Sequence, residues 1–419
     1  MNLFFSLFLI LFLLQTIACS NLVLVGGHLA DDNEVVYKRI ISLAGGENSY
    51  IGVITAASAP EDAKENGEYY KKLFEKYGAN KVDWIPIDLN HTSNNDNPDV
   101  VSMINKMTGF FFGGGDQERL ITCFYLKNRA QSLALKTIQR RYSNYDAVIA
   151  GSSAGTTIQQ GIPMVTGGES WDACEQTKPY PKYDPDYPDY LTYNPDGGFN
   201  FFKHGSLDTH FSQRGRQGRM IRLTSYGKIQ HYYGIDENTA LVVLDSLSNN
   251  PTMEIISPPD EVSGVWVMDL SQSSEYTKND YWNIKDVKAS FLTEGDKYYP
   301  STGKYVVANW KTSLNGREIY PSPMTPTDDV FSSPDANSRQ NKRLKSLTRT
   351  NPNKFTKVST DLFDSKGDNT YGITYENDPT YKVFFQKSAT FNSEGFQGYK
   401  KNLNYYSIRN MKIDIKYDD

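Results

Sequence analysis

Short apolar runs alternate with longer amphipathic segments over the first part of the chain. The runs span residues 22–27, 51–58, 81–87, 109–115 and 146–153. Segments 60–78 and 117–142, which lie between them, have the spacing of surface helices. Continuous apolar strands separated by helices are typical of a parallel sheet that helices cover on both faces. The pattern therefore predicts an α/β fold whose functional groups collect where the strands end.

The pattern breaks at residues 168–200, where prolines are interspersed with many tyrosines and aspartates. Such a segment cannot form a helix or a central strand, and we interpret it as a surface insertion. Strand-like runs resume at 240–244, 253–257 and 264–270, and we expect them to finish the sheet as antiparallel strands. From residue 305 to 419 we expect a small β-rich C-terminal appendage, partly disordered at its polar, proline-containing start, 321–353.

The N-terminus, residues 1–20, has the composition of a secretory signal peptide. Its apolar part, 3–14, is short for a membrane span, and the small residues Ala18, Cys19 and Ser20 follow it. A positively charged start is missing, and a retained membrane anchor stays an alternative. A lipid attached to Cys19 is a second alternative, because "TIAC" resembles a bacterial lipoprotein signal. We expect a secreted protein, extracellular or lumenal, without a stable membrane span.

Two further features bear on an exported protein. Asn90 begins the sequon Asn-His-Thr in a polar stretch and is a candidate glycosylation site. Removal of the leader would leave Cys123 and Cys174, which form either one disulfide or two free thiols.

The composition excludes little beyond nucleic-acid binding. The 419 residues, 22% of them charged and 38% hydrophobic, suit a globular protein of one large domain or two ordinary ones. The net charge of −5 is not gathered in one block, so we expect no nucleic-acid partner.

A serine turn follows the run that ends at residue 153. Gly151-Ser152-Ser153-Ala154-Gly155 matches the Gly-x-Ser-x-Gly elbow, in which a sharp turn from strand to helix exposes a serine hydroxyl. The start of the next helix would supply backbone N–H groups for an oxyanion. A plain loop is the competing interpretation.

A nucleophilic serine needs a base, and the chain has five histidines. His28 follows a strand-ending Gly-Gly, His91 lies in the sequon, and His204 and His231 have no partner pattern around them. His210 lies in "DTHFSQRGRQGR", a run whose arginines suit a substrate carboxylate.

The third member of a triad would orient that histidine. Asp236 and Glu237 precede an apolar run, and one of them could cap the turn while the other points into the site. The glycines of "FFFGGGDQERL" could complete an oxyanion hole, with Asp116 and Gln117 at the start of the next helix.

These four elements together resemble the cyanophycinase family and its relatives, the aspartyl dipeptidases of the peptidase E type. The resemblance lies in the Ser-Ala-Gly elbow, "HFSQRGRQGR", "GIDENTALVV", "GGDQ" and "LTEGDKYYPSTGK". It covers roughly residues 21–304, which we expect to form the peptidase domain, and it does not extend to 305–419. It implies a flavodoxin-like or class I glutamine amidotransferase-like fold.

The resemblance also implies a function and its residues. Ser153 would be the nucleophile, His210 the general base and Glu237 the orienting acid, in a serine-type exopeptidase that splits cyanophycin or related β-aspartyl peptides into dipeptides. No metal and no organic cofactor is implied, and no two histidines have the spacing of a zinc motif. The remaining site residues implied are Gly114 and Ala154 for the oxyanion, and Asp116, Gln117, Arg214, Arg216 and above all Arg219 for the substrate.

Two departures from the family qualify the substrate. The separation of Ser153 and His210 is longer than usual, which the insertion explains, and Thr209 stands where the family commonly has glutamine. The alternatives are therefore a peptidase of the same fold for another aspartyl or isoaspartyl peptide and, less favoured, a non-catalytic secreted binding protein. A homodimer is an open alternative to a monomer.

Overall fold

The computed structural model describes residues 20–259, 262–323, 326–332 and 353–418. The expected signal peptide lies outside these residues except for Ser20, as does most of the stretch expected to be disordered. Within the described part of the chain, no helix is both long and apolar enough to cross a membrane.

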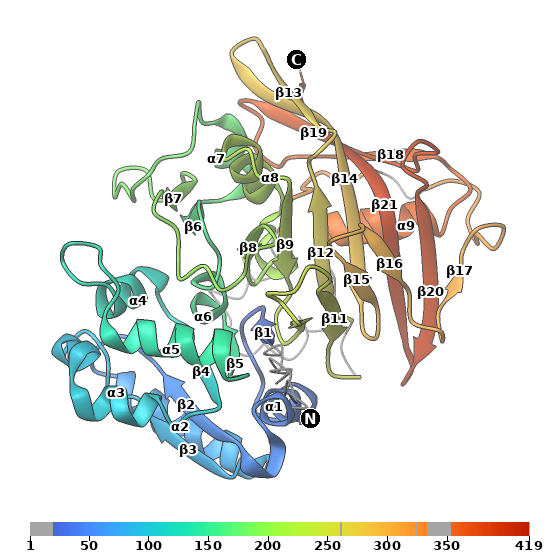
Figure 1. Ribbon diagram of the computed structural model, residues 1–419. Coiled ribbons are helices and arrows are strands. Elements are labelled where there is room, and N and C mark those ends of the chain that lie inside the picture. The colour runs from blue at the N-terminus through green and yellow to red at the C-terminus, as the bar shows by residue number, and fades with distance from the viewer. Residues whose placement is uncertain (1–19, 260–261, 324–325, 333–352, 419) are drawn as a thin grey trace, which may run out of the picture.

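A nine-stranded sheet forms the first half of the molecule (Figure 1). Its strand order is β16-β15-β11-β10-β1-β5-β4-β2-β3. The five strands from β1 to β3 in this order are parallel, and the other four are antiparallel to their neighbours. The bounds are β1 (Leu22–Val25), β2 (Tyr50–Ile54), β3 (Lys81–Trp84), β4 (Gly109–Phe112), β5 (Val148–Ser152), β10 (Ala240–Leu244), β11 (Thr252–Ile256), β15 (Lys297–Tyr299) and β16 (Lys304–Val306).

Helices cover both faces of this sheet, as the apolar pattern predicts. Along β4, Phe111 packs with α1 and α2 on one face, whereas Phe110 and Phe112 pack with α3, α4 and α5 on the other. The bounds are α1 (Glu34–Leu43), α2 (Ala63–Lys76), α3 (Pro98–Ile104), α4 (Gln117–Phe124) and α5 (Leu133–Asn144), with short 3-10 turns η1 (Gly46–Asn48) and η2 (Thr92–Asp96). The segment 117–142 forms two helices because Ser132 caps a new one.

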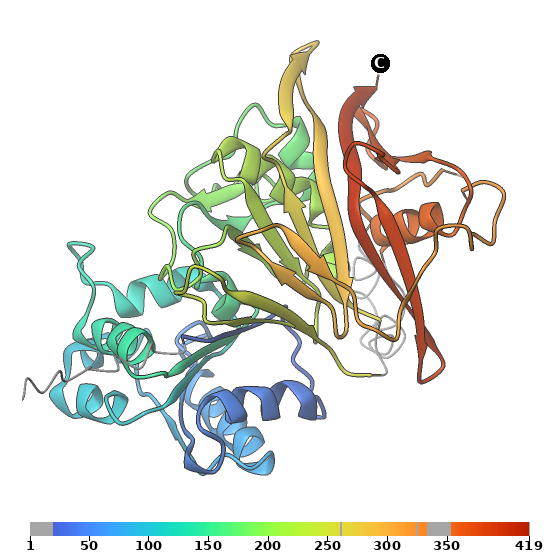
Figure 2. The same cartoon turned by 45° about the vertical axis from the view of Figure 1, so that its right-hand side comes forward.

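A second, ten-stranded sheet lies beside the first (Figure 2). Its main path is β17-β20-β21-β14-β12-β9-β8; β13 pairs with β14, and β19 joins β18 to β21. The bounds are β8 (Ser206–Asp208), β9 (His231–Ile235), β12 (Gly264–Asp269), β13 (Ser274–Lys278), β14 (Tyr281–Thr293), β17 (Thr312–Ser313), β18 (Asn369–Ile373), β19 (Thr380–Gln386), β20 (Glu394–Lys400) and β21 (Leu403–Asp418). The flanking helices are α7 (Ser170–Glu175), η3 (Ser212–Arg214), α8 (Gln217–Tyr226) and α9 (Lys354–Phe363).

One strand lies elsewhere than expected. The run 264–270 forms β12, which pairs with β9 and β14 in the second sheet instead of finishing the first. Val265 and Val267 join the core of the first half, whereas Trp266 and Met268 join the core of the second. Because both faces of β12 are apolar, the strand is buried between two cores.

The C-terminal region is β-rich, as expected, and its strands continue the second sheet. β21 pairs with β14 between Ile408 and Ile415. Lys311 and Asp296, whose side chains are fully buried, form an ion pair of 2.8 Å, and Lys311 also donates to Ser407 on β21. The C-terminal strands are therefore joined to the preceding residues by backbone pairing and by a buried polar cluster.

The segment 168–200 contains more structure than its prolines suggest. The prediction that it has no helix is wrong at its start, because α7 ends before the first proline, Pro179. At its other end β7 (Thr192–Asn194) pairs with β6 (Met164–Gly167), and Thr192 also forms a bridge with Tyr180. Between them the chain lies largely exposed on the surface.

Candidate active site

The serine turn has the geometry of a nucleophile elbow. Ser153 lies between β5 and the short helix α6 (Ala154–Thr157), with φ 57° and ψ −122°. A Cβ on Gly151 would lie 2.1 Å from the carbonyl oxygen of Gly155, and a Cβ on Gly155 would lie 2.0 Å from that of Phe112. The two glycines are therefore needed because backbone approaches backbone on both sides of the serine.

His210 lies on the loop after β8 and reaches this serine. Its Nε2 is 2.7 Å from Ser153 Oγ. The backbone N–H of His210 donates to the carbonyl oxygen of Gly26 at 2.6 Å. A Cβ on Gly27, where φ is 100°, would lie 2.3 Å from the imidazole. Gly27 thus leaves the space that the ring occupies at the end of β1.

The two acidic residues that follow β9, Asp236 and Glu237, have different hydrogen-bond partners. Glu237 Oε1 lies 2.6 Å from His210 Nδ1. Asp236 is buried and accepts hydrogen bonds from the N–H groups of Ser212 at 2.9 Å and Gly264 at 3.1 Å. Burial raises the pKa of Asp236 to about 6. Asp236 therefore fixes the turn, and Glu237 points to the histidine.

The surroundings of His210 favour its neutral form. Burial lowers the pKa of His210 well below its usual value, and the charges of Arg214, Arg216 and His28 add to this effect. A neutral imidazole that donates Nδ1–H to Glu237 keeps a lone pair on Nε2 for the hydroxyl of Ser153.

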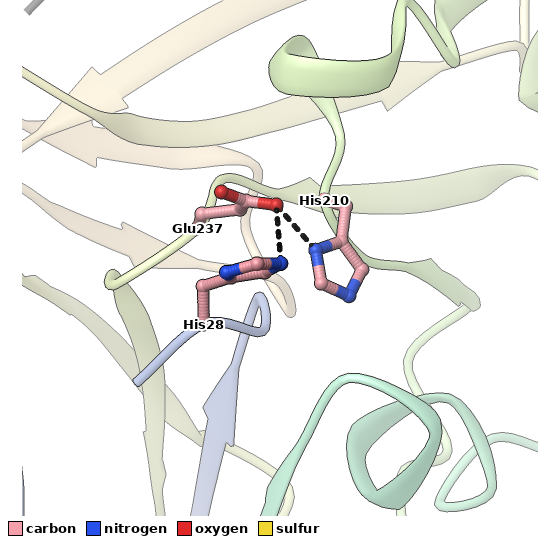
Figure 3. A group of neighbouring side chains, drawn as sticks. All are labelled: His28, His210 and Glu237. Atoms are coloured by element: carbon pink, nitrogen blue, oxygen red, sulfur yellow. Dashed lines mark hydrogen bonds and ion pairs between the residues drawn. The ribbon is translucent and has the colours of Figure 1, made fainter. Parts of the chain in front are cut away.

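His28 completes a cluster that sequence reasoning missed (Figure 3). Its Nε2 is 3.5 Å from Glu237 Oε1, and its ring meets that of His210 edge to face, with centroids 5.1 Å apart. The available signal was its place at the end of β1, beside the serine-bearing strand β5. The histidines do not have the sequence spacing of a zinc motif. In the fold, however, His28, His210 and Glu237 each place one potential ligand atom within 4.8 Å of the other two.

The three predicted arginines differ in their surroundings. Arg219, only 4% exposed, donates from Nε and NH2 to Asp208 at 2.8 Å and from NH1 to Gly168 O at 2.7 Å. Arg216 shares Asp208 through a bond of 3.1 Å, and burial lowers the pKa of Arg216 to about 9. Arg214 is half-buried and forms no ion pair with any described residue. The donors of Arg219 thus bind groups of the protein itself, whereas Arg214 lies outside the Asp208 cluster.

The predicted oxyanion side lies against the serine. A Cβ on Gly114 would lie 3.2 Å from Ser153 Cβ, and Ala154 is the first residue of α6, whose N–H points out of the helix start. Asp116 caps α4 by accepting from the N–H of Glu118 at 2.8 Å, and Gln117 donates to Val165 O at 2.9 Å. Both predicted substrate contacts already have a partner within the protein.

A known protein family matches the part of the chain that carries the candidate site. The model of peptidase family S51 matches residues 22–249, more than half of the sequence. The chain belongs to peptidase family S51. The matched segment contains Ser153, His210 and Glu237 and ends after β10.

The chain is also similar to individual proteins. The chain is similar to cyanophycinases of Nostoc sp., at 25% identity over 266 residues (63% of this chain, 80% of the relative), and of Geminocystis herdmanii, at 25% over 292 residues (68% and 94%). It is also similar to the crystal structure of a peptidase from an acI-B1 Actinobacterium, with 17% identity, a TM-score of 0.43, and coverage of 63% of this chain and 96% of that one.

The remaining sequence candidates of this S51 member are the two cysteines and the sequon. Cys123 and Cys174 are both buried free thiols, and burial raises the pKa of each to about 12. Of the two alternatives for the cysteines, a disulfide or two free thiols, the structure shows two free thiols. Asn90 is exposed ahead of η2; its glycosylation stays a prediction.

Proposed function

We propose that this S51 peptidase is a secreted serine-type exopeptidase with Ser153 as nucleophile, His210 as general base and Glu237 as the acid that orients the base. The hydrogen-bonded series from Ser153 Oγ through both nitrogens of His210 to Glu237, with spacings of 2.7 and 2.6 Å, carries this proposal. A protein that only binds a ligand gains nothing from such a series on a strained turn.

The reaction is acyl transfer. His210 Nε2 takes the hydroxyl proton as Ser153 Oγ attacks the substrate carbonyl, and the Glu237 carboxylate stabilises the imidazolium. The N–H groups of Gly114 and Ala154 bind the oxyanion. His210 then protonates the leaving amine, and a water molecule activated by the same histidine releases the acyl group from Ser153.

The substrate class we propose is β-aspartyl peptide, with cyanophycin as its first member. Two relatives bear the name cyanophycinase. Arg214 is our candidate for the substrate carboxylate, because it is near enough to lower the pKa of His210 and keeps its guanidinium out of the Asp208 cluster. A guanidinium pairs with a carboxylate through two parallel hydrogen bonds.

A different aspartyl or isoaspartyl peptide is the second candidate. Thr209 is buried, 3.5 Å from Thr157 on α6, so its hydroxyl offers the substrate less than a longer amide would. The proposal of secretion rests on residues 1–20 and on the exposed sequon at Asn90.

The test is hydrolysis of cyanophycin by the purified chain without its leader, with dipeptide products identified by mass spectrometry. Ser153→Ala serves as the blank. We expect β-aspartyl-arginine from the wild type alone. Release of another isoaspartyl product from a peptide panel would move the substrate to the second candidate, and equal product from Ser153→Ala would refute the serine mechanism.

A further inference from the structure

We propose that His28, His210 and Glu237 form a binding site for Zn²⁺, and that the bound ion switches the serine off. Binding is independent of the proposed function, whereas the inhibition rests on it. The donor set is two imidazole nitrogens and one carboxylate oxygen, a combination that suits zinc and disfavours magnesium or calcium.

One of the donor spacings is close to what zinc requires, and the three ligand atoms all lie within 4.8 Å of one another. Zinc bonds of about 2.0–2.1 Å at tetrahedral angles place two ligand atoms about 3.3 Å apart. His28 Nε2 and Glu237 Oε1 are 3.5 Å apart, near this value. His210 Nδ1 and Glu237 Oε1, at 2.6 Å, must separate by less than an ångström as the hydrogen bond between them is replaced by two bonds to the metal.

The three donors lie on loops that bind one another. The N–H of His210 donates to Gly26 O at 2.6 Å, and that of Asn238 donates to Gly27 O at 2.8 Å. Ala30 N–H in turn donates to the side chain of Asn238 at 3.0 Å. Because each loop is fixed to the one that carries His28, little ordering is left for the metal to impose.

The site also has an open side. The side chain of His28 is 50% exposed, whereas that of His210 is 6% exposed. Figure 3 shows both rings directed at the same carboxylate oxygen of Glu237. An ion can therefore approach along His28 and keep a water molecule as its fourth ligand.

Zinc at Nδ1 would reverse the chemistry of His210. The metal takes the Nδ1 lone pair, the proton of Nδ1 leaves to solvent, and Nε2 gains one, so the imidazole stays neutral. Nε2 then carries a hydrogen and can no longer accept the proton of Ser153. Glu237, now a metal ligand, no longer orients the base.

The experiment uses the metal-free chain, titrated with ZnCl₂ by calorimetry and with CoCl₂ by visible absorption, since tetrahedral Co²⁺ has a distinct spectrum. The test variant is His28→Asn, because asparagine tolerates the left-handed backbone at this position, where φ is 46°. The control is His91→Asn, which removes an exposed imidazole that lies 2.9 Å from Asp88, another potential zinc pair.

We expect one tight zinc site per chain, a tetrahedral cobalt spectrum, and at least a tenfold loss of affinity in His28→Asn but not in His91→Asn. Zinc should also block labelling of Ser153 by a fluorophosphonate, and EDTA should restore it. Equal affinity in the wild type and His28→Asn, loss in His91→Asn, or no binding would overturn the site. A metal-free wild type that is not labelled would instead count against the proposed function, and the binding titrations would still decide the metal site.

Discussion

Asp208 holds the cationic loop behind His210, and its replacement by asparagine tests that role. Its side chain is 1% exposed and lies 2.8 Å from Arg219 and 3.1 Å from Arg216. Burial alone would raise the pKa of Asp208, but the two guanidinium groups hold it below its usual value. The single carboxylate therefore pairs with two cations in a buried site.

Asp208→Asn keeps the shape but removes the charge. The new amide would also direct N–H groups at the donor Nε of Arg219, which lies 2.8 Å from Asp208 Oδ2. Removal of one partner from a buried ion pair costs about 3–5 kcal/mol, because the other charge is left without compensation. We expect a loss of this size in the free energy of unfolding.

Equilibrium urea unfolding, followed by tryptophan fluorescence, measures the loss. The double variant Asp208→Asn/Arg219→Met should lose less than the two single variants added together, since it removes both members of one pair. A loss below about 1 kcal/mol in Asp208→Asn, or strict additivity, would refute the buried-pair account.

Three further variants test other parts of the structure. Gly155→Ala should abolish folding of the elbow or soluble expression, because the new Cβ would lie 2.0 Å from Phe112 O; soluble yield and circular dichroism measure this. Lys311→Met should lower the urea midpoint by an amount equivalent to about 3–5 kcal/mol, since it leaves Asp296 buried without its cation. Burial raises the folded-state pKa of Asp172 to about 6, so its ionisation destabilises the fold as pH rises from 4 to above 6. Asp172→Asn should therefore be more stable than the wild type at pH 8, by about 1 kcal/mol after solvent screening, and equal to it at pH 4, in thermal melts at both pH values.

Matched control variants separate these specific effects from a general loss of stability caused by any substitution. Gly113→Ala should fold, because its Cβ would meet nothing closer than 3.4 Å. Lys38→Met breaks an exposed pair with Glu34 and should leave the urea midpoint essentially unchanged, because solvent screens that pair. Folding of Gly155→Ala, equal losses in Lys311→Met and Lys38→Met, or a stability difference of Asp172→Asn that does not change with pH would contradict the respective predictions.

The parallel part of the fold follows from local sequence. β1, β2, β4 and β5 are short apolar runs, and such runs are buried on both faces only in a covered sheet. The position of β12 could not be predicted in this way, because an apolar run on both faces does not reveal which of two sheets it joins. The pairing of β21 with β14 links residues far apart along the chain and has no local signal.

The candidate site was likewise predictable only where its residues lie in one local sequence pattern. The roles of Gly151, Ser153 and Gly155 could be predicted from the sequence, because all three belong to one local turn. His28 was passed over because its contact with Glu237 forms only when the ends of β1 and β9 meet in the fold. For Arg219, no sequence pattern distinguishes a guanidinium that pairs with buried Asp208 from one that binds a substrate.

The measurement that tests the central claim most directly is peptide mapping after treatment with a fluorophosphonate. We predict one phosphonyl group per chain, attached to Ser153, formed by the wild type but lost in His210→Ala and much slower in Glu237→Gln. Labelling of another serine, or equal labelling of Ser153 in His210→Ala, would contradict the assignment of Ser153, His210 and Glu237 as a catalytic triad.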